Sequence, residues 1–362
     1  MSFDLVLRSD EKAVFALREL YRKYGYQQYK MSKFEEYGLY LKNKDFLVSD
    51  NVITFTDTDG RLMALKPDVT LSIIKNGRDN PNGLQKVYYD ENVYRVSKGT
   101  KCFKEIRQVG LECLGDVDDY AVTEVLSLAK KSLESISEDY LLDVSSIDVI
   151  KGVMDDACVS IQGQKEVLNF LAEKNVQGVE QVLVKEGVEN KDALIKLVTT
   201  YGAPEKVSKV LSGIKCSDKT RSSIDRLLSI VNALSILGGA DKVEIDFSVA
   251  GDMNYYNGIV FKGFVSGIPT GILSGGQYDN LMEKMQKNSR AIGFAVYLDE
   301  LNKFNKETSD GVDVAIQYND APITEVVSLV KELTESGKSV LAEKVVPQKA
   351  KYKKLIELGK KE

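Results

Sequence analysis

The sequence predicts an α+β fold in which an antiparallel sheet is flanked by helices. The segment from Tyr88 to Gly115 gives the first observation, because two strand-like runs joined by the basic connection 97–101 predict a hairpin. Successive amphipathic helices from 151 to about 240 give the second, before strand-like sequence resumes at 243–247. We therefore expect a core from 1–150 and 241–306, a helical insertion at 151–240 and a small C-terminal α/β segment at 307–362.

The elements on either side of the hairpin follow from hydrophobic periodicity, caps and turn residues. Before it we expect a helix from Ser9 or Asp10 to Gly25, a strand at 26–31, a hairpin at 53–65 with its turn at 59–60, and a short helix from Pro67 to Gly77. After it we expect a helix at 118–136, strands at 140–144 and 259–265, a tight turn at Gly275 and Gly276, and a helix opened by Tyr278. In the C-terminal segment we expect strands at 313–317 and 339–341 and helices at 323–336 and 351–360, the last with a basic, solvated face.

Composition excludes several classes of function. The chain has 362 residues, a net charge of -5 and no histidine, so histidine cannot serve it as a base, nucleophile or metal ligand. The acidic balance argues against a general polyanion-binding surface. The four cysteines lack a CxxC spacing, which predicts free thiols in a reducing compartment. Without a signal-peptide core or a membrane-spanning run, a cytoplasmic protein is expected.

One strand carries an unusual polar face. Side chains alternate along a strand, so Gln108, Gly110 and Glu112 point the same way. A glycine between an amide and a carboxylate predicts a hole about one side chain deep, suited to a small cationic or amphoteric ligand. The alternative is an amphipathic strand whose Gln108 and Glu112 face solvent.

This segment resembles motif 2 of the class II aminoacyl-tRNA synthetases, and 108–112 resembles the histidyl branch. Further resemblances to that branch lie at 67–70, at the tyrosine pair 255–256, at 275–279 and at 291–301, and the helix at 9–25 with its following strand is similar to motif 1. The resemblance implies a class II synthetase-like antiparallel sheet and a histidine site. Its residues would be Asp68, Thr70, Gln108, Glu112, Tyr256 and Tyr278.

In that site, the resemblance pairs Glu112 with the imidazole and assigns Asp68, Thr70 and Gln108 to the amino group. The residues themselves leave simpler alternatives open. Asp68 could serve solely as a helix cap, and Tyr256 and Tyr278 could each be a core aromatic residue. Since neighbouring side chains on a strand face opposite ways, we expect only one of Tyr255 and Tyr256 to line a pocket.

Departures from the synthetase pattern indicate a different function. Arg95 matches the arginine of motif 2 and is a candidate anion-binding residue, but Glu300 and Gly251 stand where two further ATP-binding arginines are expected. A carboxylate in place of a cation replaces a charge-assisted bond to phosphate with repulsion. We therefore expect no adenylation, no catalytic residue, no cofactor and no metal site.

A histidyl-synthetase fold with these losses and a short, anticodon-domain-like tail resembles the regulatory subunits of ATP phosphoribosyltransferase. The resemblance implies a noncatalytic subunit that activates the short-form catalytic subunit and carries feedback inhibition by histidine in histidine biosynthesis. It also implies a homodimer within a hetero-oligomer, with no membrane and no tRNA partner. Two alternatives remain, an active histidyl-tRNA synthetase and a synthetase-like RNA-binding module.

Overall fold

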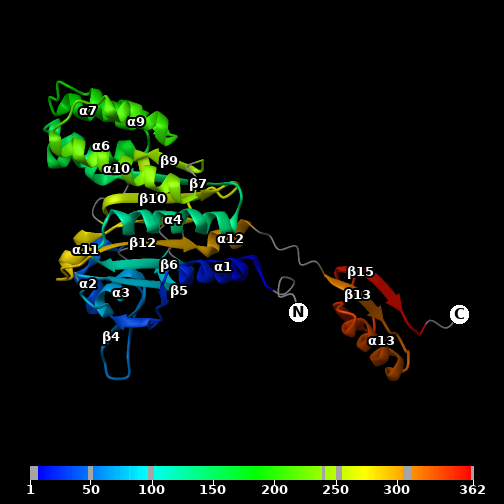
Figure 1. Cartoon of the computed structure of the whole chain (residues 1–362). Helices are drawn as coiled ribbons and strands as arrows, with labels where there is room; N and C mark the ends of the chain where they lie inside the picture. Colours follow the sequence, from blue (N-terminus) through cyan, green and yellow to red (C-terminus); the bar gives the residue numbers. More distant parts are fainter. Residues whose placement is uncertain are drawn as a thin grey trace. The chain divides into compact units, whose positions relative to one another are not determined.

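The computed structural model describes residues 7–47, 52–80, 82–96, 102–238, 241–249, 255–304 and 311–359. The chain divides into two compact units, Met1–Phe304 and Asn305–Glu362 (Figure 1). No helix in the described ranges is long and apolar enough to cross a membrane.

The larger unit is built on a nine-stranded sheet. Most neighbouring strands run antiparallel, and the exceptions are the pairs β1–β5 and β7–β9, which are parallel. This confirms the predicted α+β class with an antiparallel sheet. In sheet order the strands are β1 (Gln27–Gln28), β5 (Leu84–Val96), β6 (Phe103–Gly115), β12 (Arg290–Tyr297), β11 (Leu273–Gln277), β10 (Asn257–Val265), β7 (Tyr140–Ser146), β9 (Val243–Asp246) and β8 (Tyr201–Gly202).

One face of this sheet is covered by helices α1 (Ser9–Lys23), α4 (Asp119–Ile136) and α5 (Ile147–Asp156), as Figure 1 shows for α1 and α4. Alternate residues of β6, namely Val109, Leu111 and Cys113, are fully buried in the core between these layers. The start of α4 is capped, since the Asp118 carboxylate accepts a hydrogen bond from the Ala121 N–H at 2.8 Å.

The opposite face of the sheet holds a second, smaller core. Short helices and a separate three-stranded sheet pack there, and the hairpin predicted at 53–65 forms two of its strands with Gly60 at positive φ in the turn. Its elements are β2 (Phe34–Glu36), α2 (Tyr37–Lys42), the 3-10 turn η2 (Lys44–Phe46), β3 (Thr54–Thr56), β4 (Leu62–Leu65), α3 (Thr70–Asn76) and α11 (Asp279–Lys284).

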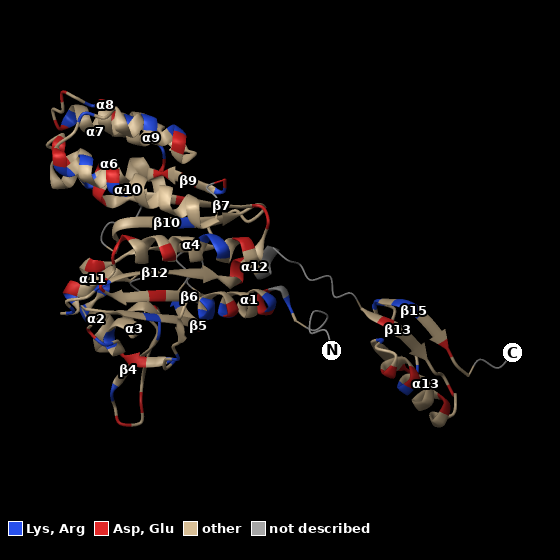
Figure 2. Cartoon of the chain, in the orientation of Figure 1, with Lys and Arg blue, Asp and Glu red and all other residues tan. Residues whose placement is uncertain are grey.

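Residues 151–240 contain a run of helices, as predicted, with one helix that sequence periodicity did not single out, α9. The helices after α5 are α6 (Ile161–Ala172), α7 (Val176–Lys185), α8 (Asp192–Thr199), α9 (Pro204–Ser212) and α10 (Asp218–Gly238). Lys, Arg, Asp and Glu residues are interspersed along them (Figure 2). The 3-10 turn η3 (Phe247–Val249) follows β9. The last helix of the unit, α12 (Leu298–Phe304), follows β12.

In its described residues, the smaller unit is a three-stranded parallel sheet with one helix. It contains β13 (Val312–Gln317), α13 (Ile323–Glu335), β14 (Val340–Glu343) and β15 (Tyr352–Glu357). The prediction of a helix at 351–360 is wrong, because this segment forms β15 beside the central strand, β13. Pairing there satisfies the free backbone edge of β13, and Ile356 packs into the small core, while the lysines that favoured a helix remain exposed.

Candidate functional site

A cavity of about 260 Å³ opens on the second face of the large sheet. This volume lies just below the range of about 300 to 1,000 Å³ that is usual for drug-sized ligands, so an amino acid is of suitable size. All six residues predicted for the histidine site line it, and so does the candidate anion-binding residue. They are Asp68, Thr70, Gln108, Glu112, Tyr256, Tyr278 and Arg95.

Strand β6 places its polar face into this cavity. Gln108 and Glu112 line the cavity and are 3% and 2% exposed, whereas Val109 and Leu111 between them lie in the core on the other side. The predicted alternation is confirmed, and the solvent-facing alternative for this strand is wrong.

Glu112 is the most deeply buried charge-bearing group of the cavity. Its carboxyl accepts hydrogen bonds from the Thr70 hydroxyl at 2.9 Å and from the Tyr278 hydroxyl at 2.6 Å. Burial raises the pKa of Glu112 to about 8, although both hydroxyl groups act in the opposite direction. A cationic ligand group beside it would restore the carboxylate, so the cavity is prepared for a positive charge.

Asp68 has two roles in the structure. Its carboxylate accepts a hydrogen bond from the Leu71 N–H at 2.9 Å, so it caps helix α3 as the simpler alternative proposed, and it also lines the cavity. Burial raises the pKa of Asp68, while the nearby Arg95 guanidinium opposes this shift. Arg95 is held in turn by the bond from its Nε to the Pro67 carbonyl, at 2.9 Å.

The expectation that only one tyrosine of the pair lines a pocket is wrong. Tyr255 and Tyr256 both line the cavity, and their rings meet edge-on with centroids 4.6 Å apart. The alternation rule fails because the two residues precede β10, in a turn, where successive side chains need not face opposite ways.

Three glycines make room for the side chains of the cavity. A Cβ at Gly110 would lie 2.5 Å from the Tyr89 hydroxyl, one at Gly293 would collide with the Glu112 carboxylate, and one at Gly276 would lie 2.8 Å from the Tyr256 ring. The predicted hole at Gly110 is therefore filled by Tyr89, its partner on β5. The predicted tight turn at 275–276 is also wrong, because both glycines lie within β11.

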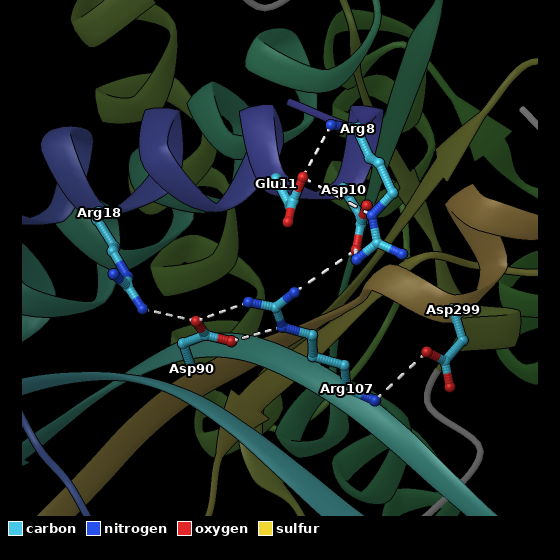
Figure 3. A network of polar contacts seen from close by, with 7 residues as sticks. All are labelled: Arg8, Asp10, Glu11, Arg18, Asp90, Arg107 and Asp299. Carbon is cyan, nitrogen blue, oxygen red and sulfur yellow. Dashed lines mark hydrogen bonds and ion pairs between the residues drawn. The ribbon is translucent and has the colours of Figure 1, made fainter. Parts of the chain in front are cut away.

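Behind the cavity, an ionic network fixes the hairpin β5–β6 to helix α1 (Figure 3). Arg107 contacts Asp90 through Nε at 2.9 Å and Nη2 at 3.0 Å, and Arg18 of α1 reaches the same carboxylate at 2.6 Å. Arg107 also reaches Asp10 at 3.5 Å. Because Gln108 follows Arg107 in the chain, the network fixes the backbone that aims Gln108 into the cavity.

The residues at the expected ATP positions are placed differently from the prediction. Glu300 lies on α12 outside the cavity lining, where it accepts a hydrogen bond from the Thr270 hydroxyl at 3.2 Å. Repulsion by Glu300 inside the cavity is therefore not what the structure shows. Gly251 lies outside the described residues. Among the described lining residues, Arg95 carries the only positive charge, and a tyrosine that sequence reasoning missed, Tyr297, lines the cavity near it.

Comparisons with known proteins identify the family to which the chain belongs. A family model described as histidyl-tRNA synthetase matches residues 7–301. An ATP phosphoribosyltransferase regulatory subunit of Thermoanaerobacter sp. is 30% identical over 319 residues, which are 84% of this chain and 82% of that protein.

Two solved structures share the fold. A Bacillus halodurans structure described as an ATP phosphoribosyltransferase regulatory subunit/histidyl-tRNA synthetase has a TM-score of 0.75 at 21% identity, covering 97% of this chain and 94% of that one. A chain of the ATP phosphoribosyl transferase complex of Thermotoga maritima has a TM-score of 0.63 at 20% identity, covering 80% and 97%.

The sheet, its glycine-framed cavity and the matched family model define a histidyl-tRNA synthetase-like protein of the class II fold. Within that class, the chain belongs to the family of ATP phosphoribosyltransferase regulatory subunits.

Proposed function

We propose that this chain binds histidine in the cavity and, through it, carries feedback inhibition of a short-form ATP phosphoribosyltransferase catalytic subunit that needs it for activity. The single observation that carries this proposal is the buried Glu112 carboxyl, held by Thr70 and Tyr278 at the floor of an amino-acid-sized cavity.

The two ends of histidine are matched by different groups. Glu112 pairs with the imidazole ring. Burial holds a proton on Glu112, and the ring, whose ordinary pKa is near 6.5, can accept that proton, so that an imidazolium lies beside a carboxylate. Asp68, Thr70 and Gln108 hold the amino group, and the Thr70 hydroxyl also donates to Glu112. The walls are aromatic, from Tyr256 and Tyr278. Arg95 is the cation of the described lining that suits the carboxylate.

The charges of the cavity support a sensor rather than an adenylating enzyme. Binding of a triphosphate needs several cations. The described lining has one cation, Arg95, and two acidic side chains, Asp68 and Glu112. The chain would therefore supply regulation, and the catalytic subunit the phosphoribosyl chemistry.

Regulation follows from linkage. Histidine shifts the assembly between active and inhibited states only by as much as its affinity differs between them. A homodimer of this chain within a cytoplasmic hetero-oligomer is the arrangement we propose, and the similarity of fold to a chain of the Thermotoga maritima complex supports such a partnership.

Reconstitution with the short catalytic subunit encoded in the same genome tests the proposal. The two chains should elute together in size-exclusion chromatography, and the rate of phosphoribosyl transfer should rise on mixing and fall when histidine is added. Separate elution with no change of rate would contradict the proposal.

The match to the histidyl-tRNA synthetase family model favours one alternative function, the activation of histidine by ATP. Histidine-dependent exchange of pyrophosphate into ATP detects that reaction directly, and we expect none above background. A synthetase-like RNA-binding module is disfavoured by the interspersed charges of α6 to α9 (Figure 2) and the acidic balance of the chain. A salt-dependent gel shift with tRNA would reverse that conclusion.

A further inference from the structure

A second cavity, of about 170 Å³, lies among the helices of residues 151–240 and shares no lining residue with the first. Two of the four cysteines of the chain, Cys158 and Cys216, line it together. Cys158 is exposed and Cys216 is half-buried, so solvent and small molecules reach these thiols. The carboxylates of Asp156 and Glu189 and the ammonium group of Lys215 share its wall.

The two cysteines are brought together by the packing of the end of α5 against the start of α10. Gly152 lies so close to α10 that a Cβ there would come within 2.6 Å of the Thr220 hydroxyl. One turn later, the Asp156 carboxylate accepts a hydrogen bond from the Ser217 N–H at 2.9 Å. Cys158 lies two residues after Asp156, and Cys216 directly precedes Ser217, so one cysteine stands close to this clamp on each chain segment.

The backbone at Cys158 is unusual for its residue type. Helix α5 ends in a Schellman motif, in which the Cys158 N–H bonds to the Asp155 carbonyl at 2.9 Å and the Val159 N–H bonds to the Met154 carbonyl at 3.1 Å. Glycine is the usual residue at the left-handed position of this motif, but here Cys158 adopts a φ of 54°. The side chain is thus projected from a turn whose backbone is fixed.

We propose that Cys158 and Cys216 form a reversible dithiol–disulfide pair that ties the turn after α5 to the turn before α10. With a low-molecular-weight disulfide such as glutathione disulfide as oxidant, one thiolate attacks its S–S bond and releases one glutathione thiol. The second cysteine then attacks the protein sulfur of the mixed disulfide, which forms the Cys158–Cys216 bond and releases the second glutathione thiol. Two electrons and two protons pass from the protein to glutathione. The inference is independent of histidine binding.

The test uses the full chain with the exposed Cys102, which does not line this cavity, replaced by serine. This host retains three of the four cysteines. After incubation with glutathione disulfide, the count of free thiols in the denatured protein should fall from three to one. A tryptic digest without reduction should then contain peptide 152–165 linked to peptide 216–219, and dithiothreitol should separate them.

Matched single variants distinguish pairing from separate reactivity. In the same host, Cys158→Ser and Cys216→Ser should each give no linked peptide and should carry glutathione on the remaining thiol of the cavity. The proposal is overturned if the host itself carries glutathione on both cysteines without a link, or if both stay reduced at an oxidant concentration that modifies the single variants.

Discussion

Replacing Glu112 by glutamine should stabilise the ligand-free protein. In the folded chain burial raises the pKa of Glu112 to about 8, against 4.5 for an ordinary glutamate. Between these values the folded state holds a proton that the unfolded state has released, so the free energy of unfolding falls as pH rises from about 4.5 to about 8. At 1.36 kcal/mol for each pH unit, wild type loses about 5 kcal/mol over that window.

A glutamine does not titrate, and its amide can still hydrogen-bond to the hydroxyls of Thr70 and Tyr278, which donate or accept. Glu112→Gln should therefore gain stability on the order of 3 to 5 kcal/mol at pH 8.5, and about 1 kcal/mol or less at pH 5. Urea unfolding followed by circular dichroism at the two pH values measures both differences.

Glu124→Gln is the matched control. Glu124 is also buried, but it pairs with Lys86 at 2.6 Å, so its loss should lower stability by about 2 kcal/mol. The reasoning is refuted if Glu112→Gln is no more stable than wild type at pH 8.5, or if its gain does not depend on pH. The same variant should bind histidine at least about 30-fold more weakly by calorimetry, because a lost buried charge pair costs about 2 to 5 kcal/mol.

Three other substitutions test the surroundings of the cavity. Gly110→Ala should cost about 3 kcal/mol in urea unfolding, because its Cβ would meet the Phe294 carbonyl, whereas Gly38→Ala, with no atom within 4 Å, should cost nothing. Asp90→Ala should lower stability by about 2 kcal/mol, since it leaves two arginines, whose side chains are 33% and 31% exposed, without their shared carboxylate; a melting temperature equal to that of wild type would contradict this. Tyr278→Phe should weaken histidine binding about tenfold in calorimetry, as it removes a donor to the Glu112 carboxylate; unchanged affinity would place the ligand elsewhere.

The parts of the site that the sequence predicted are those governed by local periodicity. Gln108 and Glu112 face one way because side chains alternate along a strand, and Asp68 caps α3 because an acidic side chain satisfies free N–H groups at a helix start. Both rules act over a few residues, so no tertiary information was required. The placing of all six residues in one cavity followed from the family resemblance, and their roles toward histidine stay a prediction.

What the sequence did not predict depends on contacts between distant segments. Tyr89 occupies the space beside Gly110 across the hairpin, and the Glu112 side chain occupies the space beside Gly293 on the neighbouring strand. Each glycine is therefore explained only by its partner in register. Likewise, 351–360 is a strand because β13 has a free edge, which no local pattern reveals. Glycines facing large side chains in adjacent strands are the signal that could have located the cavity.

Histidine inhibition of the reconstituted enzyme tests the central claim most directly. Phosphoribosyl transfer by the catalytic subunit is measured against histidine concentration with the wild-type chain and with Glu112→Gln. We predict that both chains activate the catalytic subunit and that only the wild-type complex is inhibited at low histidine. Equal inhibition of the two complexes would show that the cavity is not where histidine acts.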